Sequence, residues 1–305
     1  MTHIRSRALQ TIGAAWLAIT LIFFGLRLIP GDALMAQLIE SGASDSVIAL
    51  RRTELGLDLP IAIQYLRFLS ELVRGDLGTS LTSAQAVTDL LIAQLWPTLE
   101  IAFASLAVAI IMGLLLGAAA AGQRIMSNIA LFLIALAISA PIYWTGTLAI
   151  YVFTVILGLL PSGGAGRPSQ VILPALVLGW QLAGSLGRVT QVALNEVTSA
   201  PHMLTASAKG LRRIEIALRH HLRPALPPII AHLGVQAGFL LGGAVITETI
   251  FSRPGIGRML IDAVLRQDYP VVQGIAIWVC LVVAVITFAA DWLVFLVDPR
   301  VREAV

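Results

Sequence analysis

Two carboxylates stand out because each belongs to a long apolar run. Glu248 lies toward the end of the run 229–251, and Asp291 lies toward the end of the run 271–297. A carboxylate at the centre of a bilayer costs about 2.5–3.5 kcal/mol on insertion scales, so such a residue commonly marks a function. Near the end of a span this cost falls. For Glu248 two interpretations stay open, namely a contact with a path or partner and a structural polar pair; for Asp291 the structural pair is favoured.

Other residue types that could do chemistry form no catalytic pattern. Four histidines crowd one region, at His202, His220, His221 and His232. They lack the carboxylate or thiolate partners of a metal site, so we interpret them as solvated loop histidines and expect no metal site. The pattern GxxxxGK[ST], which cradles nucleotide phosphates, does not occur, so no ATP binding by a P-loop is expected. We assign no catalytic residue and expect the chain to bind no cofactor of its own.

The stretch Ser199–Pro228 is the only long basic segment between apolar runs. Ser199 can cap a first short helix, and Gly210 supplies the left-handed residue that ends it. A second short helix is predicted from about Arg212 to Leu222, ending at Pro224. Small residues around Ala206 and Ala208 let another surface approach closely. A short basic helix that needs a partner is typical of a docking element.

The residues of this stretch resemble the cytoplasmic coupling motif of ABC importer permeases. TASAKGL (205–211) and RHHLRPALPP (219–228) look most like the dipeptide, oligopeptide and nickel permease family. Two positions depart from the family pattern: Leu204 stands about where many members have glutamate, and Pro224 replaces the usual asparagine. The resemblance implies that the ATPase-coupling residues are Leu204, Thr205, Ala206, Ser207, Ala208, Lys209, Gly210, Leu211 and Arg212.

Composition places the chain in the membrane. Of its 305 residues 58% are hydrophobic and only 12% are charged, whereas soluble domains carry about 25% charged residues. The net charge of +3 does not indicate nucleic-acid binding, because the basic residues lie at span ends and in one loop. Cys280 is the only cysteine and permits no internal disulfide. An integral protein of the lipid bilayer is therefore predicted.

The apolar runs predict an all-α membrane protein with six transmembrane helices in a single domain, 1–305. The predicted spans are 8–29, 98–122, 129–157, 171–187, 229–251 and 271–297, each long enough or nearly so to cross a bilayer. The first run could also be a cleaved signal peptide, but its length favours a retained span. Residues 188–228 are predicted to form a cytoplasmic coupling loop.

Residues 30–97 are predicted to form an acidic outer segment. A helix is predicted to begin at Pro60 and end at Gly75, with apolar residues at helical spacing. A second apolar stripe consists of Val87, Leu91 and Leu95. Two interpretations stay open for these stripes: amphipathic helices that lie on the bilayer surface, and a platform for a protein that delivers the solute.

Charge decides the predicted orientation. With six spans and both termini in the cytoplasm, eleven basic residues lie inside against four acidic ones, as the positive-inside rule requires. The basic residues are Arg5, Arg7, Arg124, Arg188, Lys209, Arg212, Arg213, Arg219, Arg223, Arg300 and Arg302, and the acidic ones are Glu196, Glu215, Asp298 and Glu303. The predicted location is the cytoplasmic membrane of a bacterium or archaeon.

A second group of motifs extends the resemblance over nearly the whole chain. LGGAVITETIFSRPGIGRML (241–260), QDYPVVQG (267–274) and DPRVR (298–302) are similar to segments of the same family. From the residues alone, 241–260 predicts a span end, a turn at Pro254–Gly255 and a short outer helix. The family places this region beside the translocation path, so the candidate path or packing residues are Gly242, Gly243, Glu248, Pro254 and Gly255.

The resemblance predicts the permease subunit of an ATP-driven ABC importer, with the type I permease fold. It implies a homologous second permease subunit, two cytoplasmic ATPase subunits that use ATP and Mg, and an extracytoplasmic solute-binding protein. Two alternatives are a secondary transporter and a non-transporting membrane subunit of a larger complex. The cargo stays open among dipeptides, oligopeptides, nickel, metallophores and oligosaccharides.

Overall fold

The computed structural model describes residues 2–28, 44, 46, 49–50, 53, 56, 58–199, 222–242 and 244–297. The regular secondary structure of these parts is helical, apart from an isolated bridge between Thr79 and Ala86. Five helices are long and apolar enough to cross a membrane, and a bent pair can supply a sixth crossing. The predicted all-α class is confirmed. The helices are α1 (Thr2–Leu28), α4 (Ile61–Val73), α5 (Val87–Ala120), α6 (Arg124–Ser139), α7 (Ile142–Ile150), η1 (Tyr151–Ile156), α8 (Ser169–Thr198), α11 (Arg223–Leu241), α12 (Val245–Ile250), α13 (Ile256–Leu265) and α14 (Tyr269–Val297).

Small residues let α5 and α8 cross closely in the centre of the bundle. Gly113 and Gly117 form a GxxxG pair on α5, and the structure places them against Leu186 and Thr190 of α8. A Cβ at Gly113 would lie 2.9 Å from the Leu186 Cβ. Without a hydrophobic driving force in lipid, such close backbone approach is what holds membrane helices together.

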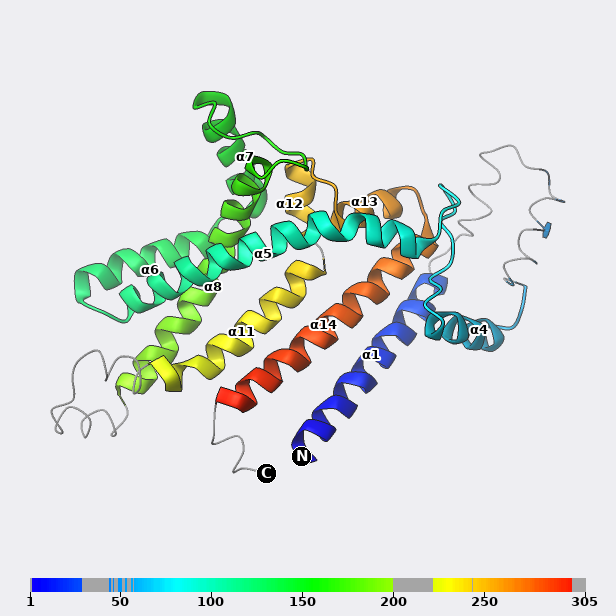
Figure 1. Cartoon of the computed structure of the whole chain (residues 1–305), viewed down its shortest axis with the longest axis horizontal. Coiled ribbons are helices and arrows are strands. Elements are labelled where there is room, and N and C mark those ends of the chain that lie inside the picture. Colours follow the sequence, from blue (N-terminus) through cyan, green and yellow to red (C-terminus); the bar gives the residue numbers. More distant parts are fainter. Residues whose placement is uncertain are drawn as a thin grey trace.

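A second group of helices, α11, α14 and α1, lies side by side (Figure 1). Gly234 of α11 faces Ala290 of α14, and a Cβ at Gly238 would touch Val283 at 3.4 Å. These small residues of α11 therefore let α14 pack closely against it. The amino end of α1 and the carboxyl end of α14 lie on the same side of the bundle (Figure 1).

The fourth span is longer than predicted. α8 continues to Thr198, so residues 188–198, which were assigned to the coupling loop, are helical. Their polar residues led the prediction to end the span at Gly187. In the structure these polar residues share one helix face, while Thr190, Ala193 and Val197 continue the buried face at helical spacing.

The predicted third span, 129–157, is broken. α6 ends at Ser139, and α7 leaves it at a bend of 100°. Ala140 and Pro141 adopt extended backbone, with ψ of 121° and 137°. Proline disfavours the helical conformation at the residue before it, and here the chain leaves the helix at Ala140. In Figure 1 α7 turns away from the direction of α6.

The predicted fifth span, 229–251, is also different. α11 begins at Arg223 and ends at Leu241, and α12 is a separate short helix. Pro224 occupies the first turn of α11, where its missing N–H costs nothing because first-turn N–H groups have no intrahelical partner. Pro224 therefore lies inside the first turn of α11, and the short helix predicted before it lies, up to residue 221, outside the described residues.

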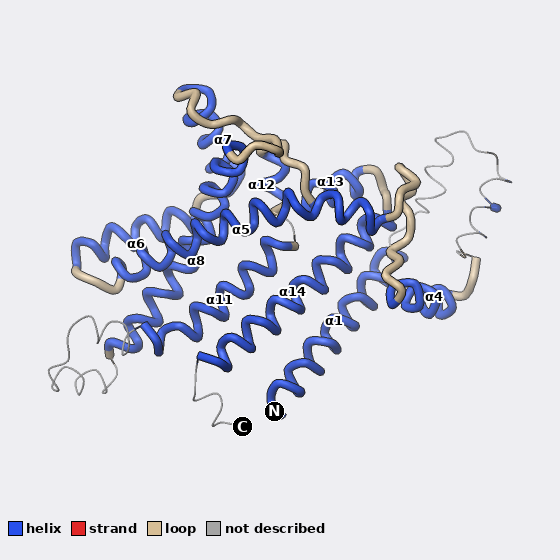
Figure 2. The backbone as a smooth tube through the Cα atoms, viewed as in Figure 1, coloured by secondary structure: helices blue, strands red, loops and turns tan. Residues whose placement is uncertain are grey.

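The predicted outer segment is corrected at its second stripe. α4 confirms the helix after Pro60, and Gly75 stops it with a φ of 77°. The stripe of residues 87–95, however, belongs to α5, which continues through Pro97. Val87 and Leu91 are buried against α13 and α14, so this stripe is packed inside the protein and does not lie on a bilayer surface. Figure 2 shows loops gathered at this end of the bundle, beside α4, α12 and α13.

Candidate functional site: the polar turn beside α12 and α13

Residues 248–258, which we call the polar turn, begin with Glu248. Its side chain is completely buried. Thr98 of α5 donates a hydrogen bond of 2.8 Å to Glu248 Oε1, and the Arg258 N–H donates one of 2.9 Å to Oε2. The Thr98 hydroxyl also accepts a hydrogen bond of 2.9 Å from the Ile256 N–H. Of the two interpretations of Glu248, these contacts favour the structural polar pair.

Two glycines make room for this carboxylate. A Cβ at Gly255 would overlap the carboxyl group of Glu248, and a Cβ at Gly257 would lie 2.6 Å from the Val245 Cα. The turn predicted at Pro254–Gly255 and the short helix after it are confirmed by α13. Gly255 is therefore a packing residue, required because the backbone passes directly over Glu248.

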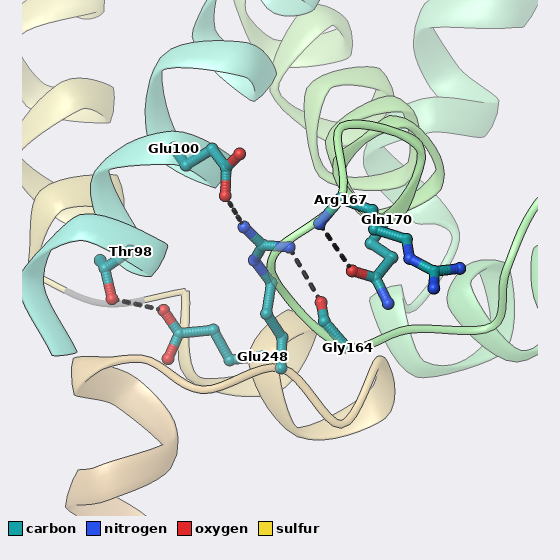
Figure 3. Close-up of polar contacts among 7 residues, drawn as sticks. Thr98, Glu100, Gly164, Arg167, Gln170 and Glu248 are labelled. Carbon is teal, nitrogen blue, oxygen red and sulfur yellow. Dashed lines mark hydrogen bonds and ion pairs between the residues drawn. The ribbon is translucent and has the colours of Figure 1, made fainter.

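Arg253 fastens the polar turn to two other parts of the chain. Its side chain is completely buried. It forms an ion pair with Glu100 of α5, and its Nη1 donates a hydrogen bond of 3.0 Å to the Gly164 carbonyl. Figure 3 shows the Glu100 carboxylate and the Gly164 carbonyl at these two contacts, and the Glu248 carboxyl group directed at Thr98. One guanidinium thus joins α5, the loop before α8 and the polar turn.

The electrostatics of Glu248 are those of a buried acid held by donors. Burial raises the pKa of its carboxyl group. Hydrogen bonds from the Arg258 N–H, from Thr98 and from the Gly257 N–H, together with the nearby charge of Arg253, act in the opposite direction. Because the donors all come from fixed backbone or from α5, the carboxylate works as a fastening point for the turn.

A further buried carboxylate was missed in the sequence. Asp268 is 2% exposed and ties the loop before α5 to the start of α14. It accepts hydrogen bonds from Ser80 Oγ at 2.6 Å and Thr82 Oγ1 at 2.8 Å, and from the N–H groups of Leu81 and Thr82. Burial acts to raise the pKa of Asp268, but these hydrogen bonds outweigh it and lower the pKa. The available signal was the hydroxyl-rich loop TSLTS (79–83) before Val87, but Asp268 is 188 positions away from Ser80.

An open cavity of about 410 Å³ lies between these two carboxylate sites. The loop before α5, the first turns of α5, the polar turn and α13 line it together. Pro254 and Gly255, two of the predicted path or packing residues, lie on its wall with Arg258 and Gln94. Gly242, a third, packs at the end of α11, where a Cβ would lie 3.0 Å from Val279 of α14. Gly243 lies outside the described residues.

Comparison with known proteins decides the family. The family model of the binding-protein-dependent transport system inner membrane component matches residues 109–303. The chain belongs to this family. It is also 35% identical over 305 residues to the glutathione transport system permease protein GsiC of Salmonella paratyphi A, and equally to GsiC of Escherichia coli K12, with 99% of each chain covered. The predicted ABC importer permease of the peptide permease type is thereby confirmed.

Solved structures agree on the fold. The permease chain of the MetNI methionine ABC transporter, in an inward-facing conformation, matches with a TM-score of 0.55 at 22% identity, covering 69% of this permease and 97% of that chain. A chain of an amino acid ABC transporter with histidines matches with a TM-score of 0.51 at 17% identity, covering 70% and 94%. The expected type I importer fold is confirmed.

The structure places His232 of this permease elsewhere than predicted. It was interpreted as a solvated loop histidine, but it lies within α11, a membrane-spanning helix. Its Nε2 is 3.2 Å from Ser185 Oγ of α8 and 2.9 Å from Gln236 Nε2. The prediction failed because it grouped His232 with the loop histidines His202, His220 and His221, although residue 232 lay inside the predicted span 229–251. His202, His220 and His221 lie outside the described residues.

Of the other residues singled out in the sequence, the structure describes some and not others. Asp291 of α14 pairs with Arg7 of α1 at 3.5 Å, so the structural interpretation favoured for it is supported. The coupling residues 204–212 lie outside the described residues, and their role stays a prediction. Within the described parts of the chain no group of three or more His, Cys, Asp or Glu residues could hold a metal ion.

Proposed function

We propose that this permease forms half of the translocation path of an ATP-driven importer for glutathione or a similarly small peptide. The observation that carries the proposal is the end-to-end match to GsiC, at 35% identity and 99% coverage of both chains. A match of this extent includes the loops and the polar turn, and not only the apolar spans that any membrane protein shares.

The proposed complex has a homologous second permease subunit, two ATPase subunits and an extracytoplasmic binding protein. Support comes from the family description, which names dependence on a binding protein. The basic segment 199–228 is the proposed contact with the ATPases, and the loops around the 410 Å³ cavity are the proposed contact with the binding protein. ATP and Mg would bind the ATPase subunits, and both termini of this chain would lie in the cytoplasm.

Two polar pairs distinguish this proposal from a secondary transporter. An ion-coupled transporter uses intramembrane carboxylates that exchange ions or protons. Glu248 is enclosed by Thr98 and by backbone donors, and Asp291 is paired with Arg7. Both carboxylates of the apolar runs thus have structural partners. This favours an importer whose energy comes from ATP hydrolysis in separate subunits.

The test is uptake by the reconstituted complex. The permease would be co-expressed with the permease, ATPase and binding-protein genes that adjoin its own, purified and placed in liposomes with ATP inside. We expect ATP-dependent uptake of radiolabelled glutathione, competed by unlabelled glutathione and not by Ni²⁺. Uptake of a labelled dipeptide without uptake of glutathione would reject the cargo. Uptake driven by an ion gradient without ATP would reject the importer class.

A further inference from the structure

A polar face runs along α8 inside its membrane-spanning length. Gln181, Ser185 and Arg188 follow one another at intervals of four and three residues, which places them on one side of the helix. Gln181 and Ser185 are partly exposed and Arg188 is exposed. Other spans expose apolar residues instead, such as Val285 of α14, which is 68% exposed. This side of α8 is therefore unlike the sides that suit lipid.

Polar residues of α11 lie beside this face of α8 and contact it. Gln236 is 6% exposed and bridges the two helices, because its Nε2 donates a hydrogen bond of 3.2 Å to the Leu182 carbonyl of α8. The same nitrogen lies against Ser185 Oγ and His232 Nε2. Gln236 Oε1 is buried without a hydrogen-bond partner in the described part of the protein. The contact with the Leu182 carbonyl fixes the orientation of the Gln236 side-chain amide. A carbonyl oxygen only accepts, so the amide atom that faces it must be the nitrogen.

The cluster bears on which nitrogen of His232 carries the proton. The amide nitrogen of Gln236 has two hydrogens for three neighbouring acceptors, namely the Leu182 carbonyl, Ser185 Oγ and His232 Nε2. We assign one of these hydrogens to the 2.9 Å contact with His232 Nε2, which places the proton of the neutral ring on Nδ1. Among the described residues Nδ1 has no hydrogen-bond partner, and the side chain is partly exposed. His232 thus presents a donor on the outside of the single chain.

The depth of these groups excludes a lipid surface. Ser185 is the seventeenth residue of the 30-residue α8, about 24 Å from its start, and His232 is the tenth residue of the 19-residue α11. Both lie near the middle of helices that cross the membrane. Ser185, Gln236 and Nε2 of His232 are polar partners of one another, but the hydrocarbon offers neither water nor a polar partner to Nδ1 of His232.

We propose that the polar face, meaning Gln181, Ser185 and Arg188 of α8 with His232 and Gln236 of α11, lines a water-filled route through the membrane. The donors on it, His232 Nδ1–H and the Arg188 guanidinium, hydrogen-bond the carboxylate or carbonyl oxygens of the passing solute. The solute class is thus anionic and rich in hydrogen-bond acceptors. This assignment of solute chemistry rests on the proposed importer function, whereas the presence of water rests on the polar face alone.

Cysteine accessibility tests the route. In the assembled complex with Cys280→Ala, Ser185→Cys and Gln181→Cys are compared with Val285→Cys, which is the seventeenth residue of the 29-residue α14 and lies at matched depth. Membrane-impermeant charged methanethiosulfonates require water to reach a thiol. We expect Ser185→Cys and Gln181→Cys to react at least about tenfold faster than Val285→Cys. Equal, slow reaction at all three positions, with ATP and with vanadate-trapped nucleotide, would overturn the route.

The solute contact is tested by uptake kinetics. His232→Ala is expected to raise the KM for glutathione about tenfold, the effect of losing one hydrogen bond to a charged group. His232→Asn, which keeps a donor near Nδ1, is expected to restore most of the affinity. A role only in helix packing would lower the amount of folded permease and the ATPase rate with KM unchanged, and would overturn the solute contact.

The two proposals fail separately. Labelling of Ser185→Cys does not depend on cargo, so labelling without glutathione uptake would reject the proposed cargo and keep the route. Glutathione uptake without labelling would keep the importer function and reject the route. The permease level in the membrane, measured on the same samples, identifies a variant that has not folded, and in that case Gln181→Cys decides in place of Ser185→Cys.

Discussion

Thr98 and Glu248, which are 150 positions apart in the sequence, are joined by a buried hydrogen bond of 2.8 Å. The same Thr98 hydroxyl accepts the Ile256 N–H, so one small side chain serves both the carboxylate and the first N–H of α13. The bond places α5 directly against the polar turn, and neither of the two side chains is exposed to water.

Removal of this hydroxyl should destabilise the permease. Thr98→Val leaves the Glu248 carboxylate short of a donor and the Ile256 N–H without an acceptor, at a cost of about 1–3 kcal/mol for each buried group. We expect a clear fall in the melting temperature of the detergent-purified permease, followed by fluorescence-detected size exclusion. Thr98→Ser keeps the hydroxyl and is the control; a melting temperature of Thr98→Val equal to that of the Ser variant would contradict the prediction.

The ion pair between Arg253 and Glu100 should respond unequally to loss of its two members. The Arg253 side chain is 0% exposed, whereas that of Glu100 is 33% exposed. Glu100→Ala strands a buried guanidinium, which costs about 3–5 kcal/mol. Arg253→Met removes the buried charge and leaves a carboxylate that still reaches water. The same melting assay should therefore rank Glu100→Ala below Arg253→Met, and the reverse order would show that Arg253 is solvated in the protein.

Gly255→Ala should prevent correct closure of the polar turn. The added Cβ would overlap the Glu248 carboxyl group, which Thr98 and the Arg258 N–H hold in place. We expect little folded permease in the membrane and no complex with the partner subunits. Gly25→Ala is the matched control, since a Cβ there meets nothing within 4 Å and lies on the helix α1. Normal yield of Gly255→Ala would mean that the turn can rearrange.

Asp268 makes stability depend on acid pH. The pKa of this carboxyl group is lowered in the folded protein relative to its ordinary value of 3.8. The unfolded chain therefore takes up the proton first, and the stabilisation from Asp268 is complete above about pH 4 and lost as pH falls through the folded pKa. Asp268→Asn should be less stable than the parent at pH 7, and this difference in stability should become smaller below pH 4. Asp262→Asn, an exposed change on α13, controls for lost charge; a gap that is constant with pH would contradict the prediction.

The coupling segment carries a functional prediction that lies outside the described residues. Gly210→Val should strain a left-handed residue by about 1 kcal/mol or more, and Ala206→Glu should obstruct close docking of an ATPase. Both should insert normally yet abolish uptake and reduce stimulated ATP hydrolysis in liposomes at matched permease levels. Arg212→Ala should be milder, because exposed charge contacts contribute about 0–1 kcal/mol. Normal transport by Gly210→Val and Ala206→Glu would reduce the segment to a connecting loop.

Apolar length in the sequence predicted an apolar segment at each of the five long helices and at the bent pair α6 and α7, in the order in which the structure has them. It could not predict where polar residues would lie on a helix. Residues 188–198 were assigned to a loop because of Arg188 and its polar neighbours, although one face of that stretch is buried against the bundle. Pro97 and Pro141 show the same limit: α5 continues through the first and the chain turns by 100° at the second. Which outcome occurs depends on neighbouring helices.

The candidate site was predictable in its local parts and not in its partners. The turn at Pro254–Gly255 and the helix after it follow from the residues, and the structure has them. The partners of Glu248, Arg253 and Asp268 come from α5 and from the loops before α5 and α8. Contacts over such separations leave no periodic pattern in a single sequence, and His232 was misplaced for the same reason.

The ion pair between Arg253 and Glu100 also bears on the order of biosynthesis. Its two members are 153 positions apart, so Glu100 has entered the membrane with α5 long before Arg253 leaves the ribosome. Contacts of this separation close late. Until then the Glu100 carboxylate lacks its guanidinium partner, and because it is 33% exposed even in the folded protein, it can keep contact with water while the rest of the chain is made. The partner that is made last, Arg253, is the one that the finished protein buries completely.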